Sequence, residues 1–145
     1  MADSRRVDIQ IGDDLPQLIV DRARLELILT NLMSNGIKYS DPDKALRFVR
    51  VEAAPSRTPG HACVSVRDNG IGIPAASLPS IFGRFVRVHA GRDQELGVRG
   101  SGLGLAIAAE CAEAVGGSLT VESTEGAGTT FFVTLPRAAA PDPST

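Results

Sequence analysis

Aromatic residues and net charge are both scarce in this sequence. It has no tryptophan, aromatic residues make up 4% of its 145 residues, and its net charge is −2. Nucleic-acid binding through a basic field, or through bases stacked on aromatic rings, is therefore not expected. No apolar run reaches the roughly 18 residues that a membrane-spanning helix needs, and the start, MADSRRVDIQ, lacks the apolar core of a signal peptide. These absences favour a cytoplasmic protein without direct membrane contact, or the cytosolic part of a membrane-bound one.

Cysteine and histidine are equally sparse. The two cysteines, Cys63 and Cys111, each lie in an apolar segment, which is typical of buried, reduced thiols. The two histidines, His61 and His89, have no ligand spacing with the cysteines. A metal site built from thiolates and imidazoles is therefore not expected.

The sequence does contain enough apolar material for one domain. Apolar residues make up 43% of the chain, and we expect one folded unit over 1–137, followed by a disordered tail or linker over 138–145. Apolar periodicity predicts strands at 7–12, 45–54, 61–68, 117–123 and 129–136, with a short extended piece at 15–21. It predicts helices at 22–39, capped by Asp21, and at 75–82 and 102–115. This order indicates an α+β protein, a two-layer α/β sandwich whose helices cover one face of a mixed, mainly antiparallel sheet.

The first expected helix carries a polar stripe. Asn31, Asn35 and Lys38 follow one another at spacings of four and three, so they share one narrow arc of the helix. One alternative is that this arc is merely a solvated face. The other is that an amide oxygen ligates a hard cation such as Mg²⁺ while the lysine meets phosphate.

The segment RDNGIGIP, 67–74, places a carboxylate where an expected strand ends. Asp68 is followed by Gly70 and Gly72. A carboxylate in this place can accept a hydrogen bond from an exocyclic amine, and such a bond contributes about 1.5–3 kcal/mol. That energy is sufficient to prefer adenine over a base with a carbonyl at the same position. The alternative is an ordinary Asn-Gly turn with a capping aspartate.

Three alternate glycines precede the last expected helix in the segment RGSGLGLAIA. Gly100, Gly102 and Gly104 let the main chain approach a ligand, and the helix that follows presents free N–H groups, so the segment predicts phosphate binding. The spacing is not the G-x-G-x-x-G of a dinucleotide-binding turn, and no G-K-[ST] follows as in a P-loop. The polar segment before it, 84–99, is expected to be a mobile loop.

Taken together, these segments resemble the catalytic and ATP-binding domain of sensor histidine kinases, in the wider group that shares the Bergerat ATP-binding fold with gyrase B, Hsp90 and MutL. Five segments over 7–136 are similar to the family's five boxes: RLELILTNLMSNGIKYS, DNGIGIP, IFGRFVR, GSGLGLA and EGAGTTF. The resemblance implies three helices on the sheet and a lid over the nucleotide at about 83–100.

The resemblance implies roles for individual residues. Asn35 would ligate Mg²⁺ with support from Asn31, while Lys38 and Arg87, and less directly Arg84, would contact the phosphates of ATP. Asn35, Lys38 and Arg87 would thus carry catalysis.

The same resemblance implies an adenine pocket. Tyr39 would border the base, and Asp68 would accept from its amine, in part through water shared with Thr130. Gly70 and Gly72 would let the backbone approach the base, and Phe82 and Phe85 would anchor the lid. The remaining nucleotide contacts would come from Ile73, Gly100, Ser101, Gly102, Leu103, Gly104 and Leu105.

Two departures from the family pattern affect the interpretation. Gly36 stands where the family usually has alanine; glycine within a helix costs roughly 0.5–1 kcal/mol, and we expect it to pack there without altering the site. The helical hairpin that carries the phosphoacceptor histidine is also missing, since neither His61 nor His89 lies in a helical H-E motif. The acceptor would therefore belong to a dimerisation domain of the same kinase, with a response regulator further downstream, and this piece alone would be monomeric.

The sequence favours a kinase over an ATPase. Hydrolytic members of the fold carry a general-base glutamate at the position of Asn31, and an amide has no useful basicity. Two alternatives on the same fold are a non-catalytic ATP-binding regulator and an anti-sigma-type serine kinase.

Overall fold

The computed structural model describes residues 6–83 and 104–137. Helices and strands follow one another in the order β1 (Asp8–Ile11), α1 (Arg22–Lys38), β2 (Phe48–Ala54), β3 (His61–Asp68), η1 (Ala75–Ser80), α3 (Gly104–Ala114), β4 (Ser118–Thr124) and β5 (Gly128–Pro136). The expected tail and most of the expected lid lie outside the described residues. Within those residues no helix has the length and apolar character to cross a bilayer.

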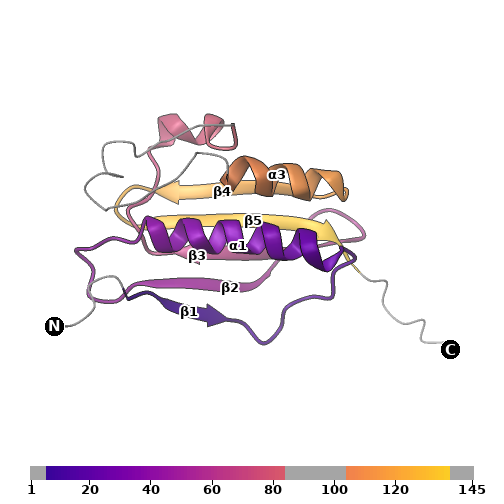
Figure 1. Ribbon diagram of the computed structural model, residues 1–145, viewed down its shortest axis with the longest axis horizontal. Coiled ribbons are helices and arrows are strands. Elements are labelled where there is room, and N and C mark those ends of the chain that lie inside the picture. Colours follow the sequence, from indigo (N-terminus) through magenta and orange to yellow (C-terminus); the bar gives the residue numbers. More distant parts are fainter. Residues whose placement is uncertain (1–5, 84–103, 138–145) are drawn as a thin grey trace, which may run out of the picture.

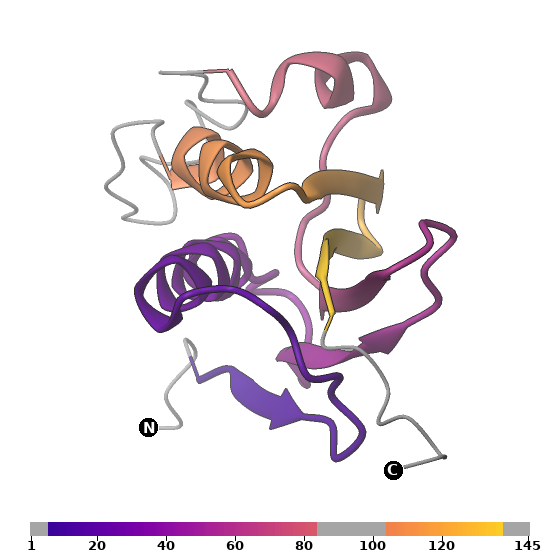
Figure 2. The same cartoon turned by 90° about the vertical axis from the view of Figure 1, so that its right-hand side faces the viewer.

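The strands form one sheet in the order β1-β2-β3-β5-β4 (Figure 1). β1 pairs with β2 in parallel, and the other neighbouring pairs are antiparallel. Figure 2 shows α1 and α3 side by side on one face of this sheet, with the short 3₁₀ helix η1 beyond β4. The predicted α+β sandwich with a mixed, mainly antiparallel sheet and three helices is confirmed.

The core lies between the two long helices and the sheet. α1 contributes Ile28 and Leu32, which are 0% and 1% exposed, and these side chains meet the inward-facing residues of the central strands. Burying each side chain of this size contributes about 1.5–3 kcal/mol. α3 faces the core with small residues, which allows it to approach the sheet closely: Ala108 and Ala112 are fully buried. The Phe82 ring meets Phe131 edge-on, with 6.2 Å between centroids.

The ends of α1 and α3 follow the sequence signals. Asp21 has an extended backbone and its side chain accepts from the Arg24 N–H at 3.1 Å, as expected of an N-cap. α3 ends at Ala114. Gly116 follows it with a φ of +83°, a conformation that favours glycine, and the Gly117 N–H returns to the Ala112 carbonyl at 2.8 Å. These caps fix where α1 begins and where α3 ends.

Within the described residues, three predicted elements differ from the structure by more than a residue at either end. β2 starts at Phe48 rather than at residue 45, because Arg47 donates to the Asp41 and Pro42 carbonyls and holds the preceding segment as a loop. The extended piece at 15–21 makes only an isolated bridge, between Leu18 and Arg137, and is not a strand of the sheet. The helix expected at 75–82 is a 3₁₀ turn that contains Pro79, which has no N–H to continue an α-helix.

Candidate functional site

The site is centred on Asp68, the last residue of β3. Asp68 is only 9% exposed, and its Oδ1 accepts from the Gly70 N–H at 2.8 Å and the Thr129 N–H at 3.3 Å. Burial raises the pKa of Asp68 to about 6, against these two N–H groups and the charge of Lys44, which lower it. Within the described part of the chain, Oδ2 accepts no hydrogen bond. A nearly buried carboxylate therefore keeps one oxygen for a donor from outside these residues.

α1 passes close to this carboxylate at Gly36. A Cβ placed on Gly36 would lie 3.3 Å from Oδ2 of Asp68 and 2.9 Å from Cγ2 of Val49. The second distance is shorter than real Cβ contacts allow. Glycine therefore lets α1 lie closer to the sheet beside Asp68 than alanine would, which gives the departure from the family pattern a steric reason.

The glycines after Asp68 are needed for packing of the chain against itself. A Cβ on Gly70 would collide with the Tyr39 carbonyl oxygen, to which the Ile71 N–H donates at 3.0 Å. Gly72 has a φ of +76°, and a Cβ there would collide with the Thr124 carbonyl oxygen. The turn 69–72 is thus fitted between the end of α1 and the β4–β5 turn. Close approach to a nucleotide remains a prediction for both glycines.

The structure corrects the prediction for Thr130. Thr130 pairs with Arg67, so its side chain lies on the opposite face of the sheet from Asp68. The cross-strand partner of Asp68 is Thr129, which is 5% exposed and shares its face. Two adjacent threonines look alike in the sequence, and only the strand register selects Thr129 as the one beside the carboxylate.

Ser123 was not identified from the sequence, although it joins three parts of the site. Its hydroxyl accepts from the Ile73 N–H at 2.8 Å, donates to the Gly128 carbonyl at 2.9 Å, and lies 2.8 Å from the Thr129 hydroxyl. The available signal was a serine facing inward on β4 near the turn before β5. Ser123 thus holds buried Ile73, a predicted nucleotide contact, against the hairpin that carries Thr129.

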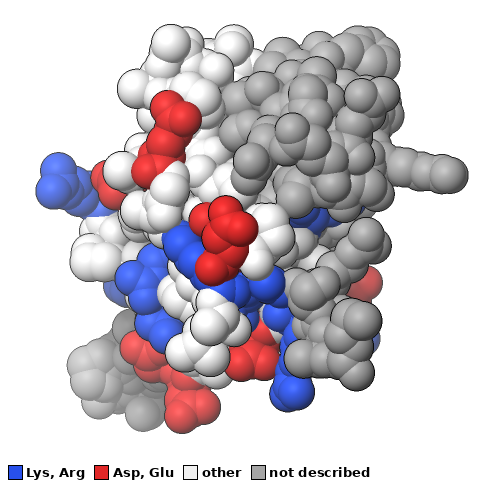
Figure 3. All heavy atoms as spheres, turned by 90° about the vertical axis from the view of Figure 1, so that its left-hand side faces the viewer, with Lys and Arg blue, Asp and Glu red and all other residues white. Residues whose placement is uncertain are grey.

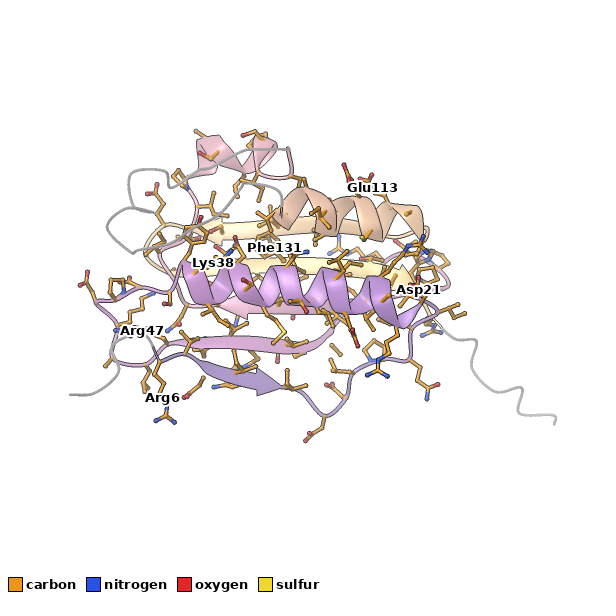
Figure 4. All side chains as sticks on the ribbon, viewed as in Figure 1. Arg6, Asp21, Lys38, Arg47, Glu113 and Phe131 are labelled. Atoms are coloured by element: carbon orange, nitrogen blue, oxygen red, sulfur yellow. The ribbon has the colours of Figure 1, made fainter. Side chains whose placement is uncertain are left out.

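The polar stripe of α1 lies on the side of the helix next to α3. Asn31 is half-buried, and its Nδ2 donates to the Leu27 carbonyl at 2.9 Å. A Cβ added to Gly104 at the start of α3 would lie 3.2 Å from the Asn31 Oδ1. Asn35 is also half-buried, one turn further along. Lys38 is exposed at the end of α1 (Figure 4) and forms no ion pair with the described residues.

These segments meet at one end of the sheet, although they are far apart in the sequence. The end of α1, the end of β3 and the start of α3 occupy this end, with the β4–β5 turn behind them (Figure 1). Tyr39 and Leu105 are half-buried here, and Leu105 packs against the core. The remaining predicted contacts lie outside the described residues: Arg84, Phe85, Arg87, Gly100, Ser101, Gly102 and Leu103.

The side chains near Asn35 determine how a metal ion could be held at this site. The described residues contain no group of three or more His, Cys, Asp or Glu side chains that could hold one. A cation here would therefore rely on few protein ligands, such as the Asn35 amide, together with phosphate oxygens and water. This is how Mg²⁺ is commonly held beside nucleotides, so the residues present fit a metal that arrives with its phosphates.

The geometry agrees with comparisons with known proteins. The chain belongs to the family of histidine kinase-, DNA gyrase B- and HSP90-like ATPases, whose model matches residues 20–139. Over 118 residues it is 41% identical to the sensor protein kinase WalK of Staphylococcus saprophyticus, covering 81% of this chain and 18% of that protein. The chain thus spans less than a fifth of that relative's length.

Solved structures point the same way. A mycobacterial sensor histidine kinase, MprB, has a TM-score of 0.73 at 28% identity, over 92% of this chain and 86% of that one. ShkA, solved at full length in complex with AMPPNP, has a TM-score of 0.72 at 28% identity, over 96% of this chain and 27% of ShkA. The chain is therefore an ATP-binding domain of the sensor histidine kinase type, which confirms the resemblance drawn from its five boxes.

Proposed function

We propose that this chain binds Mg-ATP and acts as the catalytic domain of a cytosolic kinase module, transferring the γ-phosphoryl group to a histidine on a dimerisation domain. The observation that carries the proposal is the Asp68 carboxylate, nearly buried and with Oδ2 unpartnered among the described residues. A desolvated acceptor of this kind is costly unless a donor meets it. The amine of adenine is such a donor, whereas guanine presents a carbonyl at that position.

The phosphates would lie beyond the end of α1. Lys38 is exposed and without an ion pair among the described residues, so its ammonium is available to a phosphate oxygen. Asn35 would hold Mg²⁺ through its amide oxygen, and the metal would neutralise phosphate charge during transfer. Arg87 is proposed as a further phosphate contact on the basis of the family resemblance alone.

The position of Asn31 favours transfer over hydrolysis. Its Nδ2 is engaged by the Leu27 carbonyl, and its amide oxygen cannot remove a proton from water. A histidine acceptor needs no such base, because a neutral imidazole nitrogen is already nucleophilic. The nitrogen forms a bond to the γ-phosphorus, the bond to the bridging oxygen breaks, and ADP leaves with that electron pair. A response regulator would then take the phosphoryl group from the histidine.

The test has two steps. First, the domain is titrated calorimetrically with ATP and with GTP, each with and without Mg²⁺, and Asp68→Asn serves as the variant. We expect Mg-sensitive binding of ATP, none of GTP, and loss of ATP binding in Asp68→Asn with the fold intact by circular dichroism. Unchanged ATP affinity in Asp68→Asn would contradict the adenine assignment.

Second, the domain is mixed with γ-labelled ATP and the isolated dimerisation hairpin of a WalK-type relative, or with the same hairpin carrying a His→Gln change. We expect an acid-labile, base-stable label on the histidine hairpin alone. An acid-stable label would indicate a serine kinase instead. Binding without any transfer to the hairpin would favour the non-catalytic regulator.

A further inference from the structure

The loop between α1 and β2, residues 40–47, forms one wall of the turn that follows Asp68. The Asn69 side chain joins the two segments: its Oδ1 accepts from the Phe48 N–H at 3.0 Å, and its Nδ2 donates to the Leu46 carbonyl at 2.8 Å. Arg47 closes the loop on itself through two backbone carbonyls, and it lies below the end of α1 in Figure 4. The loop 40–47 is therefore held in one conformation by these hydrogen bonds.

Lys44, in this loop, contacts the main chain of the turn that follows Asp68. Its Nζ donates to the Asn69 carbonyl at 2.6 Å and lies 3.5 Å from the Gly70 carbonyl, in partly buried surroundings. These two carbonyls belong to the residues directly after Asp68. The Gly70 N–H is also the shorter of the two N–H contacts on Asp68 Oδ1. Lys44 therefore binds the carbonyl end of the Asn69–Gly70 peptide group, whose N–H end donates to the carboxylate.

The charge of Lys44 acts on the same carboxylate. Among the described residues, the helix and strands beside Asp68 face it with uncharged groups: α1 with Gly36, β2 with Val49, and β5 with Thr129. Lys44 is the one charged group among the described residues that lowers the Asp68 pKa, in opposition to burial. Viewed from this end, Lys and Arg side chains gather among acidic ones on the described surface (Figure 3).

We propose that Lys44 is a positioning residue for the adenine-binding carboxylate, holding the turn 69–70 in place and favouring the ionised form of Asp68. This rests on the proposed function for the role of Asp68 in adenine binding. Lys44 touches neither base nor phosphate in this scheme. It acts through the two carbonyls that it binds and through the electrostatic attraction of its charge for the Asp68 carboxylate. Lys44 lies outside the five boxes that carry the family resemblance.

The test compares wild type with four variants. Lys44→Met removes donor and charge, Lys44→Gln keeps a donor and removes the charge, and Lys44→Arg keeps both. Arg57→Met removes a cation from the exposed β2–β3 turn at the opposite end of the strands and is the matched control. The Asp68 carboxyl is titrated by carbon-detected NMR. The ATP dissociation constant is measured at about pH 6, close to the wild-type Asp68 pKa, and at about pH 8, where the carboxyl is ionised.

We expect the titration midpoint of Asp68 to rise by about 0.5 to 1 in Lys44→Met and Lys44→Gln, because an attractive charge is lost. It stays near the wild-type value in Lys44→Arg and Arg57→Met. With wild-type Asp68 near 6, the ionised fraction at that pH then falls by about twofold to fivefold. The loss of ATP affinity relative to wild type is larger by this factor at the lower pH, and the comparison with wild type cancels the titration of ATP itself.

A midpoint unchanged in both Lys44→Met and Lys44→Gln overturns the proposal, whatever happens to ATP binding. A midpoint that rises equally in Lys44→Arg also overturns it, since the effect is then one of local packing. If the midpoint moves as expected but wild type binds no ATP, the coupling of Lys44 to Asp68 stands and the proposed function fails. The two ideas therefore fail on different readouts.

Discussion

Replacing Gly36 by alanine sets two known effects against each other. In an α-helix interior, alanine is favoured over glycine by about 0.8–1 kcal/mol. The new Cβ would lie 2.9 Å from Cγ2 of Val49, a β-branched residue that is 0% exposed. A stiff side chain in a closed core has little room to give, and overpacking of this kind costs about 1–3 kcal/mol. The net expectation is a loss of about 0–2 kcal/mol in the free energy of unfolding.

The same substitution tests the approach of α1 to the carboxylate. Because the Cβ would also lie 3.3 Å from Oδ2 of Asp68, either the helix or the carboxylate must shift. We expect ATP affinity to fall several-fold in Gly36→Ala, with Mg²⁺ and phosphate contacts unchanged. Urea unfolding gives the stability change, and calorimetry gives the affinity.

Thr30→Ala is the matched control for this prediction. Thr30 is exposed on the same helix, so the change raises helix propensity without a new contact. We expect it to stabilise the domain by a few tenths of a kcal/mol, on the order of the propensity difference, and to leave ATP affinity unchanged. If Gly36→Ala were stabilised by about 1 kcal/mol with wild-type affinity, the close packing of α1 against Val49 and Asp68 would be refuted.

Two further predictions concern His61 and the threonine pair. The His61 Nδ1 lies 3.0 Å from the Pro59 carbonyl and its Nε2 2.9 Å from the Gly116 carbonyl, so only the doubly protonated ring donates to both, and these contacts raise its pKa. The stability that the protonated ring adds is present below the ordinary pKa of about 6.5 and is lost as pH rises through the folded-state pKa. The melting temperature of His61→Leu should therefore lie further below that of wild type at low pH than at high pH. An equal difference at both pH values would contradict a role for the protonated ring. Thr129→Val should weaken ATP binding by about fivefold to tenfold through loss of a hydroxyl, while Thr130→Val stays within about twofold, as calorimetry would show; the reverse order would restore Thr130 to the site.

The candidate site residues that the sequence predicts are those whose signal is local. Asn31, Asn35 and Lys38 are related by helix periodicity alone, and Asp68 is marked by its place between a strand and two glycines. Each of these patterns is complete within a few residues. The structure adds that the two segments meet at the same end of the sheet.

The residues that were missed act across long sequence separations. Lys44 binds a carbonyl 25 positions away, and Ser123 accepts from an N–H 50 positions away. Main-chain carbonyls and N–H groups carry no residue type, so nothing in the sequence marks their partners. The choice between Thr129 and Thr130 failed for a related reason: a shift of one residue in strand register moves a side chain to the other face.

Gly70 and Gly72 are weaker evidence for a bound ligand than the Asp68 carboxylate is. Gly70 and Gly72 are required by the Tyr39 and Thr124 carbonyls even without a nucleotide, so a glycine motif alone is weak evidence for binding. Asp68 is different, because burial raises its pKa from the ordinary 3.8 to about 6. The ionised carboxylate therefore lowers stability, a penalty that is absent below the unfolded-state value and complete above the folded one.

This difference gives Asp68→Asn a second readout. Removing the buried charge should raise the free energy of unfolding at about pH 7 by on the order of 1–3 kcal/mol relative to wild type. The gain should shrink toward zero as the pH falls to about 3, below the ordinary value of 3.8, where the wild-type carboxyl is mostly protonated in both states. Urea unfolding at the two pH values measures it. A gain in stability near pH 7 together with loss of ATP binding would show that the Asp68 carboxylate lowers stability and is needed for binding. If Asp68→Asn were less stable than wild type at both pH values, the carboxylate would instead be needed for the fold.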